Sequence, residues 1–365
     1  MTEQEQALKV LRDQIDSIDK QIHGLLNERA KCAQQVAEVK QKYDGVKDAV
    51  FYRPEREAQV LRRVMDRNEG PLADKEVARL FREIMSVCLA LEKPMRVAFL
   101  GPEGTFTQQA ALKHFGGSAE SAPMETLAQV FREVEAGAAN YGVVPIENST
   151  EGMSTHTLDL FKRYSLRICG ELELSIHHHL LAAEGAQVEK IKKVYAHQET
   201  FAQCRGWLEA HFPHAEHCSV RSNAEGAKLA AADTACAAIA GDLAQSLYGL
   251  QILERNIEDQ ADNTTRFLII GNQIVGPSGQ DKTSILISAH DEPGALYSLL
   301  EPFHRHGISL TRIETRPGRN GGWSYMFYID FEGHADEPEV KQVLHELQAN
   351  SVELKLLGSY PKAVL

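Results

Sequence analysis

The sequence predicts three domains: an all-α domain over residues 1–93, an α/β domain over 94–272 and a βαββαβ, ferredoxin-like domain over 273–365. Three observations lead to this division. Apolar residues recur at helical spacing in the first part, short apolar runs then alternate with glycine-rich turns and helical patterns, and a polar linker at 271–282 precedes the last six elements. A chain of 365 residues is long enough for three such domains.

The first domain should begin with one very long helix, from about Glu5 to Tyr43. At ~1.5 Å per residue this helix would be about 60 Å long. No domain of this size can cover such a helix, so its apolar seam predicts pairing with a second copy of the chain. The seam consists of Leu8, Leu11, Ile15, Ile18, Ile22 and Leu25.

Two shorter helices should complete this domain. Pro54 suits the first turn of one that runs to about Arg67, and the other should end before Lys93. Polar side chains interrupt the apolar seams at Arg29, Lys40, Glu57 and Glu92. These side chains could simply extend to solvent, but several cations that face one cavity would suit an anionic ligand.

The α/β domain is expected to contain strands near 95–100, 141–147, 235–241 and 262–270, and the helical patterns between them predict parallel strands with crossover helices. The GPEGT loop places Thr105 and several backbone N–H groups at a helix N-terminus, where an anion can bind. Taken alone this loop is a tight βα turn, and it matches neither a Walker A motif nor a dinucleotide fingerprint.

The last domain should contain six elements joined by short turns. A hairpin is expected through Asn320-Gly321, because this dipeptide favours the turn of a two-stranded ribbon. The expected strands are 283–289, 308–315, 323–331 and 352–358, and the expected helices are 294–306 and 337–349.

Composition excludes several classes of function. A net charge of -12 makes nucleic acid an unfavourable partner, although residues 1–93 hold equal numbers of acidic and basic side chains and are comparatively rich in cations. The chain shows neither a secretory signal nor an apolar run long enough to span a membrane, which predicts a cytoplasmic protein. Six scattered cysteines without a CxxC pair, and a histidine triplet at 177–179 without companions at metal spacing, argue against a metal site.

The first domain resembles the all-helical chorismate mutase family over about residues 5–92, in LRDQIDSIDKQIHGLLNERAKCAQQVAEVK and FYRPERE. The resemblance implies an interlocked dimer whose active sites use both chains. It also implies that Lys40 donates a hydrogen bond to the ether oxygen of chorismate and that Glu57 binds the ring hydroxyl. The two carboxylates of chorismate would be bound by Arg12, reaching across from the other subunit, Arg29 and Arg56.

Three positions depart from the commoner pattern of that family. Glu92 stands where a glutamine is often found, Cys88 where a serine is common, and Arg53 where some members carry an acid. An ionised Glu92 would repel the negative charge that grows on the ether oxygen. We therefore expect Glu92 to be protonated, and mutase activity to fall as pH rises through its raised pKa.

The middle domain resembles prephenate dehydratase over about residues 95–271, because GPEGTF, GVVPIENSTEG, HQETFAQC and NTTRF occur in that order. The resemblance implies two α/β lobes, like those of a periplasmic binding protein, with prephenate between them. It implies Thr265 near the leaving hydroxyl, Glu147 as the alternative proton source, and Arg266 or loop N–H groups as carboxylate binders. The other implied site residues are Thr105, Asn148, Ser149, Gln203 and Phe267.

The last domain resembles the ACT regulatory family, which implies an L-phenylalanine site between two such domains. Two motifs carry this resemblance, one in the first helix of the domain and one in its second strand. They consist of Gly294, Ala295 and Leu296, and of Glu314, Thr315, Arg316 and Pro317. The alternative is a module that serves dimerisation alone.

Together the three resemblances imply a bifunctional enzyme of phenylalanine biosynthesis that needs no metal or organic cofactor. It would convert chorismate to prephenate and prephenate to phenylpyruvate, form at least a homodimer, and be inhibited by L-phenylalanine. One alternative is a non-catalytic, two-lobed binding protein with an amino-acid sensor. Another keeps the mutase activity and lacks the dehydratase activity.

Overall fold

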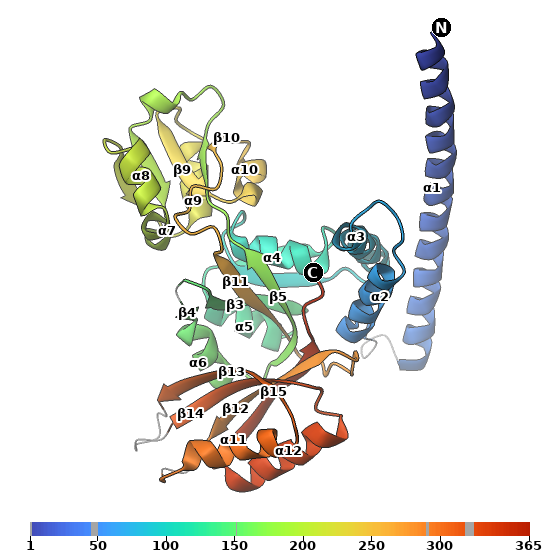
Figure 1. Cartoon of the computed structure of the whole chain (residues 1–365), viewed down its shortest axis with the longest axis vertical. Helices are drawn as coiled ribbons and strands as arrows, with labels where there is room; N and C mark the ends of the chain where they lie inside the picture. The colour runs from blue at the N-terminus through green and yellow to red at the C-terminus, as the bar shows by residue number, and fades with distance from the viewer. Residues whose placement is uncertain (1, 45–49, 151, 290–291, 318–324) are drawn as a thin grey trace.

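The computed structural model describes residues 2–44, 50–150, 152–289, 292–317 and 325–365. Figure 1 shows three helices beside a central α/β lobe, a second α/β lobe above it, and a sheet with two helices below it. The chain therefore has the all-α, α/β and ferredoxin-like parts that the sequence predicts. The predicted hairpin through Asn320-Gly321 lies outside the described residues.

The helical part consists of α1 (Glu3–Asp44), α2 (Pro54–Asp66) and α3 (Asp74–Glu92). Helix α1 has 42 residues and stands apart from the central lobe over most of its length (Figure 1). Helix α3 packs on both α1 and α2. The apolar seam of α1 is largely exposed, with Leu25 at 64% and Ile15 at 56%. The described part of one chain thus leaves this seam without a covering element.

The central lobe contains β1 (Arg96–Leu100), α4 (Phe106–Phe115), β2 (Glu120–Met124), α5 (Leu127–Glu135), β3 (Tyr141–Asn148), β4 (Gly152–Met153), α6 (Thr155–Arg163), β5 (Arg167–Ser175) and β11 (Thr264–Gly271). Its sheet has the order β2-β1-β3-β11-β5, with β4 paired to β3. Strands β1, β2 and β3 are parallel, as predicted. Strand β11 is antiparallel to both neighbours, because the chain re-enters from the second lobe where β3 ends.

The second lobe contains β6 (His179–Ala182), β7 (Lys193–Ala196), α7 (Gln198–Gln203), α8 (Arg205–His211), β8 (Glu216–Ser219), α9 (Asn223–Ala230), β9 (Cys236–Ala240), α10 (Asp242–Tyr248), β10 (Gln251–Glu254) and a short 3-10 turn (Val188–Lys190). Its sheet has the order β10-β6-β9-β7-β8. Two chain segments, 176–178 and 255–263, connect the lobes and are hydrogen-bonded to each other. The two lobes are therefore joined by a double crossing.

The last part contains β12 (Asp281–Ser288), α11 (Ala295–Arg305), β13 (Leu310–Pro317), β14 (Tyr325–Glu332), α12 (Pro338–Asn350) and β15 (Glu353–Pro361). Its antiparallel sheet has the order β13-β14-β12-β15, and its two helices lie on the outer face (Figure 1). The inner face packs on the central lobe, because Tyr328 and Tyr360 share one buried core with Leu268 and Ile270 of β11. Burial of large apolar side chains thus fixes the two sheets together.

The predicted linker is ordered by contacts with α2. The guanidinium of Arg62 donates to Ser278 Oγ at 3.0 Å, to the Gln280 carbonyl at 3.0 Å and to the Lys362 carbonyl at 3.4 Å. One helix therefore contacts both the linker and the end of the last strand. In the described part of the chain, no helix is both long and apolar enough to cross a membrane.

Candidate active sites

Three of the predicted chorismate-binding residues meet where α1 approaches the end of α3. Lys40 Nζ lies 3.8 Å from Glu92 Oε2 and donates to the Phe51 carbonyl at 3.1 Å. Burial raises the pKa of Glu92, and the nearby cations of Lys40 and Arg29 offset this only in part. A carboxyl with a raised pKa binds a proton more readily, so Glu92 can act as a hydrogen-bond donor.

Glu57 does not join this cluster. Its carboxylate lies 3.3 Å from Arg82 Nε of α3. It lines a pocket with Tyr52 and His114, at the junction of the helices with the central lobe and the C-terminal residues, whereas Lys40 is not among the residues that line this pocket. Burial raises the pKa of Glu57, and the Arg82 charge opposes this rise. Glu57 therefore belongs to the junction in the single chain.

Tyr52 and His114 line the pocket at this junction and place polar atoms in it. Tyr52 Oη and His114 Nε2 are 3.1 Å apart, and both side chains are buried. Burial, assisted by the Arg82 charge, lowers the pKa of His114 to about 3. The ring is therefore neutral at physiological pH. The pattern of the sequence did not single out Tyr52, Arg82 or His114, because each lies within an ordinary helix or loop pattern.

The remaining predicted chorismate ligands are distributed over all three helices. Arg12, Arg53 and Arg56 are exposed, and Arg53 Nη1 lies 3.5 Å from Glu55 Oε1. Cys88 is buried one turn before Glu92 on α3. Arg12 precedes Arg29 by 17 residues, which corresponds to about 25 Å along a helix. Arg12 therefore cannot reach the Lys40 cluster of its own chain.

A second polar cluster lies where the lobes of the α/β part meet. Asn148, the last residue of β3, donates from Nδ2 to Thr265 Oγ1 at 2.9 Å and to Asn263 Oδ1 at 2.8 Å. Asn263 in turn donates to Gln203 Oε1 at 3.1 Å, and His178 Nε2 lies 2.8 Å from the same oxygen. We call Asn148, Gln203, Asn263 and Thr265 the cleft network. It connects β3 and β11 of the central lobe with α7 of the second lobe.

The cleft network defines what the Thr265 hydroxyl can do. Because its oxygen accepts from Asn148, its own proton remains available for a further acceptor. Within the described residues, the hydrogen bond from Asn148 is the one that the Thr265 hydroxyl makes. Thr265 is 9% exposed, so such a hydrogen bond would form largely shielded from water.

Thr105 and Ser149 hold the backbone beside the cleft network. Thr105 caps α4, accepting from Gln108 N at 3.4 Å and donating to the Leu100 carbonyl at 3.1 Å. The next residue, Phe106, places its ring edge-on to His178. Ser149 Oγ accepts from Thr264 N at 3.0 Å. The positive N-terminal end of α4 is therefore directed toward the crossing between the lobes.

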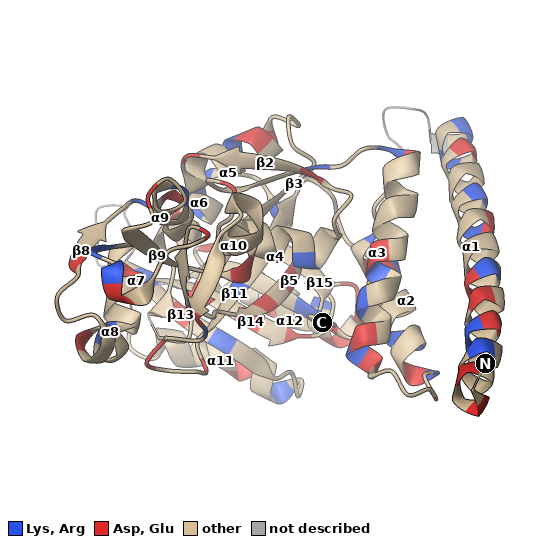
Figure 2. Ribbon diagram, turned by 90° about the horizontal axis from the view of Figure 1, so that it is seen from above, with Lys and Arg blue, Asp and Glu red and all other residues tan. Residues whose placement is uncertain are grey.

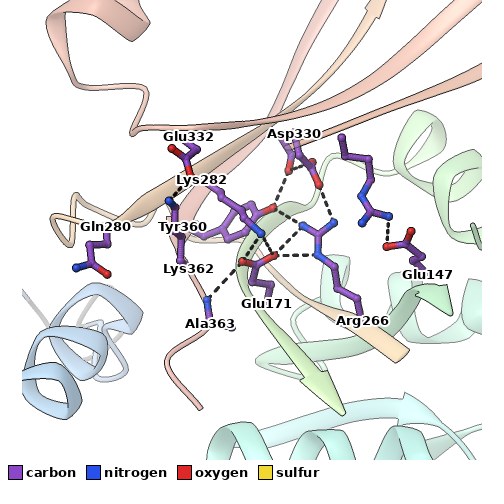
Figure 3. Close-up of polar contacts among 12 residues, drawn as sticks. Glu147, Glu171, Arg266, Gln280, Lys282, Asp330, Glu332, Tyr360, Lys362 and Ala363 are labelled. Carbon is purple, nitrogen blue, oxygen red and sulfur yellow. Dashed lines mark hydrogen bonds and ion pairs between the residues drawn. The ribbon is translucent and has the colours of Figure 1, made fainter. Parts of the chain in front are cut away.

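Arg266 is placed differently from its predicted role. Successive side chains of a strand point to opposite faces of the sheet, so Arg266 points away from Thr265. Its guanidinium is buried between two carboxylates, 2.7 Å from Asp330 Oδ2 of β14 in the last part of the chain and 2.8 Å from Glu171 Oε2 of β5 (Figure 3). This geometry does not suit the binding of a substrate carboxylate. Phe267 is also placed differently, because it is 2% exposed and packs in the core of the central lobe.

Glu147 also lies on the reverse face. Its carboxylate is paired with Arg312 of β13, while its neighbour Asn148 points into the cleft network. The sequence left open whether Thr265 or Glu147 supplies a proton. In this arrangement Thr265 lies in the cleft network, whereas Glu147 lies on the opposite face of the sheet.

The two predicted regulatory motifs lie at the surface of the last part. Gly294 has φ of +87° and precedes the first residue of α11, Ala295, a backbone conformation that favours glycine. Leu296 is 43% exposed. Residues Glu314–Pro317 belong to β13, which is the edge strand of its sheet. Arg316 of this motif lies 3.8 Å from Asp159 of α6.

The histidine triplet serves hydrogen bonding. His177 Nδ1 lies 2.8 Å from Glu258, His178 binds Gln203, and His179 Nε2 lies 3.3 Å from Asp242. Burial lowers the pKa of His178, so its ring is neutral. No group of metal-binding side chains occurs among the described residues. The sequence patterns did not predict His178 or Asn263 as site residues, although Asn263 directly precedes the TTRF motif.

Family models match three successive parts of the chain: chorismate mutase type II over residues 11–93, prephenate dehydratase over 97–274 and an ACT domain over 283–349. The curated bifunctional chorismate mutase/prephenate dehydratase of Pseudomonas aeruginosa is 58% identical over 366 residues and is covered in full, as is this chain. The protein of the same name from Escherichia coli is 32% identical, over 98% of this chain and 97% of its own.

Solved structures resemble about three quarters of the chain. A prephenate dehydratase from Arthrobacter aurescens in complex with L-Phe has a TM-score of 0.68 and 36% identity, covering 74% of this chain and 90% of that one. A quorum-quenching acylase, GqqA, has a TM-score of 0.68 and 29% identity, covering 74% of this chain and 98% of that one. These similarities confirm the predicted fold class.

Proposed function

We propose residue roles for the two reactions of this chain, which belongs to the bifunctional chorismate mutase/prephenate dehydratase family. It rearranges chorismate to prephenate and then converts prephenate to phenylpyruvate with loss of water and carbon dioxide. The observation that carries this conclusion is the full-length match to a bifunctional relative at 58% identity. We assign the mutase to residues 1–93, the dehydratase to 94–272 and the regulatory domain to 273–365.

The mutase site is proposed around Lys40, Arg29 and Glu92. A Claisen rearrangement needs neither a nucleophile nor an acid-base relay, so the enzyme must hold the compact conformer and stabilise negative charge on the ether oxygen. Lys40 and protonated Glu92 are 3.8 Å apart and could both donate to that oxygen. Arg29 would bind a carboxylate of chorismate. Glu57 is left out of this set, because Arg82 engages its carboxylate.

A homodimer is proposed to complete the mutase site. The exposed seam of α1 offers an apolar surface along a helix of 42 residues, which suits pairing with the same helix of a second copy. Arg12 lies about 25 Å from Arg29 along the helix, so the Arg12 that binds chorismate beside Arg29 would come from the other subunit. Arg56, exposed in one chain, is a further carboxylate ligand in this proposal.

The dehydratase site is proposed at the cleft network. Thr265 would donate a hydrogen bond to the ring hydroxyl of prephenate as its C–O bond breaks, while the carboxylate on the ring carbon para to it leaves as carbon dioxide and the ring becomes aromatic. The departing hydroxide becomes water by taking up a proton from the solvent. A threonine is a weak acid in water, so the shielded, oriented hydrogen bond matters more than full proton transfer. Asn148 fixes the Thr265 oxygen at 2.9 Å. Gln203 would close the site from the second lobe.

The carboxylate that prephenate keeps needs donors, and Arg266 cannot supply them from the reverse face of the sheet. The N-terminal end of α4, with Thr105 at its cap, is the proposed binder, because the backbone N–H groups of a helix N-terminus attract anions. Ser149 is proposed to shape the opposite wall. The cytoplasm is the proposed compartment, because the free cysteines of the chain suit a reducing environment.

L-phenylalanine is proposed to inhibit the dehydratase by binding at the two regulatory motifs. The motif at Gly294–Leu296 and the motif at Glu314–Pro317 are both partly exposed in one chain, which suits a site closed by a second regulatory domain. Such an inhibitor acts by binding one state of the protein more tightly than another.

A time course of chorismate, prephenate and phenylpyruvate tests the proposed function. We expect prephenate to appear first and phenylpyruvate to follow, and added L-phenylalanine to slow only the second step. Accumulating prephenate would confine catalysis to the helical domain, and unchanged chorismate would favour a non-catalytic binding protein. A parallel assay with prephenate supplied directly separates the two steps.

A further inference from the structure

Four charged residues connect the dehydratase sheet with the regulatory sheet. On the dehydratase side, Glu147 of β3 lies opposite Arg266 of β11 in the strand register. On the regulatory side, Arg312 of β13 lies opposite Asp330 of β14. Glu147 pairs with Arg312, and Arg266 Nη1 lies 2.7 Å from Asp330 Oδ2. We call these four residues the interface quartet.

The charges of the interface quartet alternate in both directions. Each sheet contributes one cation and one anion side by side, and each of these charges faces an opposite charge across the interface, so all four near neighbours attract. Glu171 of β5 and Lys282 of β12 extend the arrangement, because Lys282 Nζ lies 2.8 Å from Glu171 Oε1. Arg266 and Asp330 are almost completely buried, whereas Glu147 and Arg312 keep side-chain exposures of 31% and 23%.

The interface quartet lies directly behind the cleft network. Glu147 and Arg266 are a cross-strand pair, and the next pair in the same register is Asn148 with Thr265. The two pairs point to opposite faces of one sheet. A displacement of the Glu147 or Arg266 side chain therefore acts on the backbone that holds Asn148 and Thr265.

The regulatory side of the quartet is continuous with a predicted phenylalanine motif. Arg312 belongs to β13, the same strand as Glu314–Pro317. A ligand that shifts β13 would move Arg312, and through it Glu147, without any intervening flexible segment. Buried and half-buried ion pairs are suited to this role, because their strength depends steeply on geometry.

We propose that the interface quartet transmits the phenylalanine signal, by positioning Thr265 and Asn148 from the reverse face of the dehydratase sheet. This inference rests on the proposed function, since it assumes that L-phenylalanine binds at the regulatory motifs. Glu147 and Arg266 are positioning residues in this account. They act on the reaction through the strand backbone and do not touch prephenate.

The test uses Glu147→Gln, Arg312→Gln and the double variant of the full-length protein. These two positions are chosen because both are partly exposed and tolerate the loss of a charge better than Asp330, which is fully buried. The matched control is Lys355→Gln. Lys355 Nζ also crosses the interface, donating to the Phe161 and Tyr164 carbonyls at 2.7 Å, but it contacts neither β3 nor β11 through these bonds.

The measured quantities are dehydratase kcat and KM, mutase activity, L-phenylalanine affinity by calorimetry, and dehydratase activity at saturating L-phenylalanine. We expect each single variant to bind L-phenylalanine and to keep its mutase activity. At saturating L-phenylalanine, the fraction of the uninhibited dehydratase rate that remains should be about 5-fold or more higher in the variant than in the parent. A change of this size is within the usual range of allosteric coupling. The double variant should rise no further than either single one, because both remove the same contact.

Several outcomes would overturn the proposal. Glu147 and Arg312 variants inhibited as strongly as the parent would exclude a signalling role, as would an equal loss of inhibition in Lys355→Gln. Loss of L-phenylalanine binding in Arg312→Gln would place Arg312 in the effector site. Abolished dehydratase activity in Glu147→Gln without L-phenylalanine would make Glu147 the proton source. A parent protein that does not respond to L-phenylalanine would contradict the proposed function itself.

Discussion

The two proposed active sites differ in how much of each a single chain supplies. The cleft network is complete within one chain, and its hydrogen bonds of 2.8 to 3.1 Å connect both lobes. Among the described residues, the mutase cluster brings together Arg29, Lys40 and Glu92, and the apolar seam of α1 beside it is exposed. Figure 2 shows α1 beside α2 and α3 at one side of the molecule. An α/β fold brings distant residues together by itself, whereas a long helix separates them and needs a second helix to restore proximity.

The largest effect should come from the central residue of the complete site. Thr265→Ala should lower dehydratase kcat by about 10³-fold, because it removes the only oriented donor proposed for the leaving hydroxyl. Mutase activity should stay at the parental level. The control is Thr264→Ala, the preceding residue of β11, whose side chain points to the other face. Phenylpyruvate formed at the parental rate by Thr265→Ala would refute the proposed donor.

Mixed dimers test directly whether each proposed active site uses residues of one chain or of two. Arg12→Ala and Arg29→Ala should each lower mutase activity by about 10²-fold or more, through loss of a carboxylate ligand. Co-expression of the two variants should restore up to about a quarter of the parental activity, because half of the dimers carry one site with both arginines intact. Co-expression of Thr265→Ala with Asn148→Ala should restore no dehydratase activity. Recovery in the second mixture would show that the dehydratase site is also shared.

The pH dependence should distinguish the two sites. Above the pKa of Glu92, mutase activity should fall about 10-fold for each pH unit. Burial raises the pKa of Glu92, and its protonated form is the proposed donor to the ether oxygen. Mutase activity should therefore be full below this raised pKa and fall as pH rises through it. Glu92→Gln, a permanent donor, should give a flat profile. An unchanged profile in that variant would remove Glu92 from the mechanism.

The last effect concerns stability rather than activity, at His114 in the junction of α2 and α3 with the central lobe. The His114 pKa is about 3 in the folded chain, because of burial and the Arg82 charge, against about 6.5 in the unfolded chain. Because only the unfolded chain binds a proton at His114 between these two values, the free energy of unfolding falls as pH falls from 6.5 toward 3. The loss is about 1.4 kcal/mol for each pH unit. His114→Asn should lower the free energy of unfolding at pH 7 but make it less sensitive to acid. The exposed His214→Asn is the control, and denaturant titrations from pH 7 to 4 provide the measurement.

Much of the fold followed from local patterns. The apolar steps of three and four residues predicted α1 nearly to its ends, and the strand and helix order of the last domain was predicted element by element. The antiparallel course of β11 was not predicted, because it depends on where the chain re-enters the sheet. Motifs named both Thr265 and Asn148, which the structure joins by a hydrogen bond, although they also suggested roles for Arg266 and Phe267 that the geometry does not support.

By itself the sequence determined the three domains, their order and the motifs that identify the family, because periodicity and short motifs are local properties of the chain. It also placed Thr265 and Arg266 next to each other in one strand, whose neighbouring side chains point to opposite faces. Only the tertiary structure decided what each face meets: the cleft network on one side and the regulatory sheet on the other. It likewise placed Glu57 against Arg82, since the partner of a buried charge is set by packing between segments that are distant in sequence.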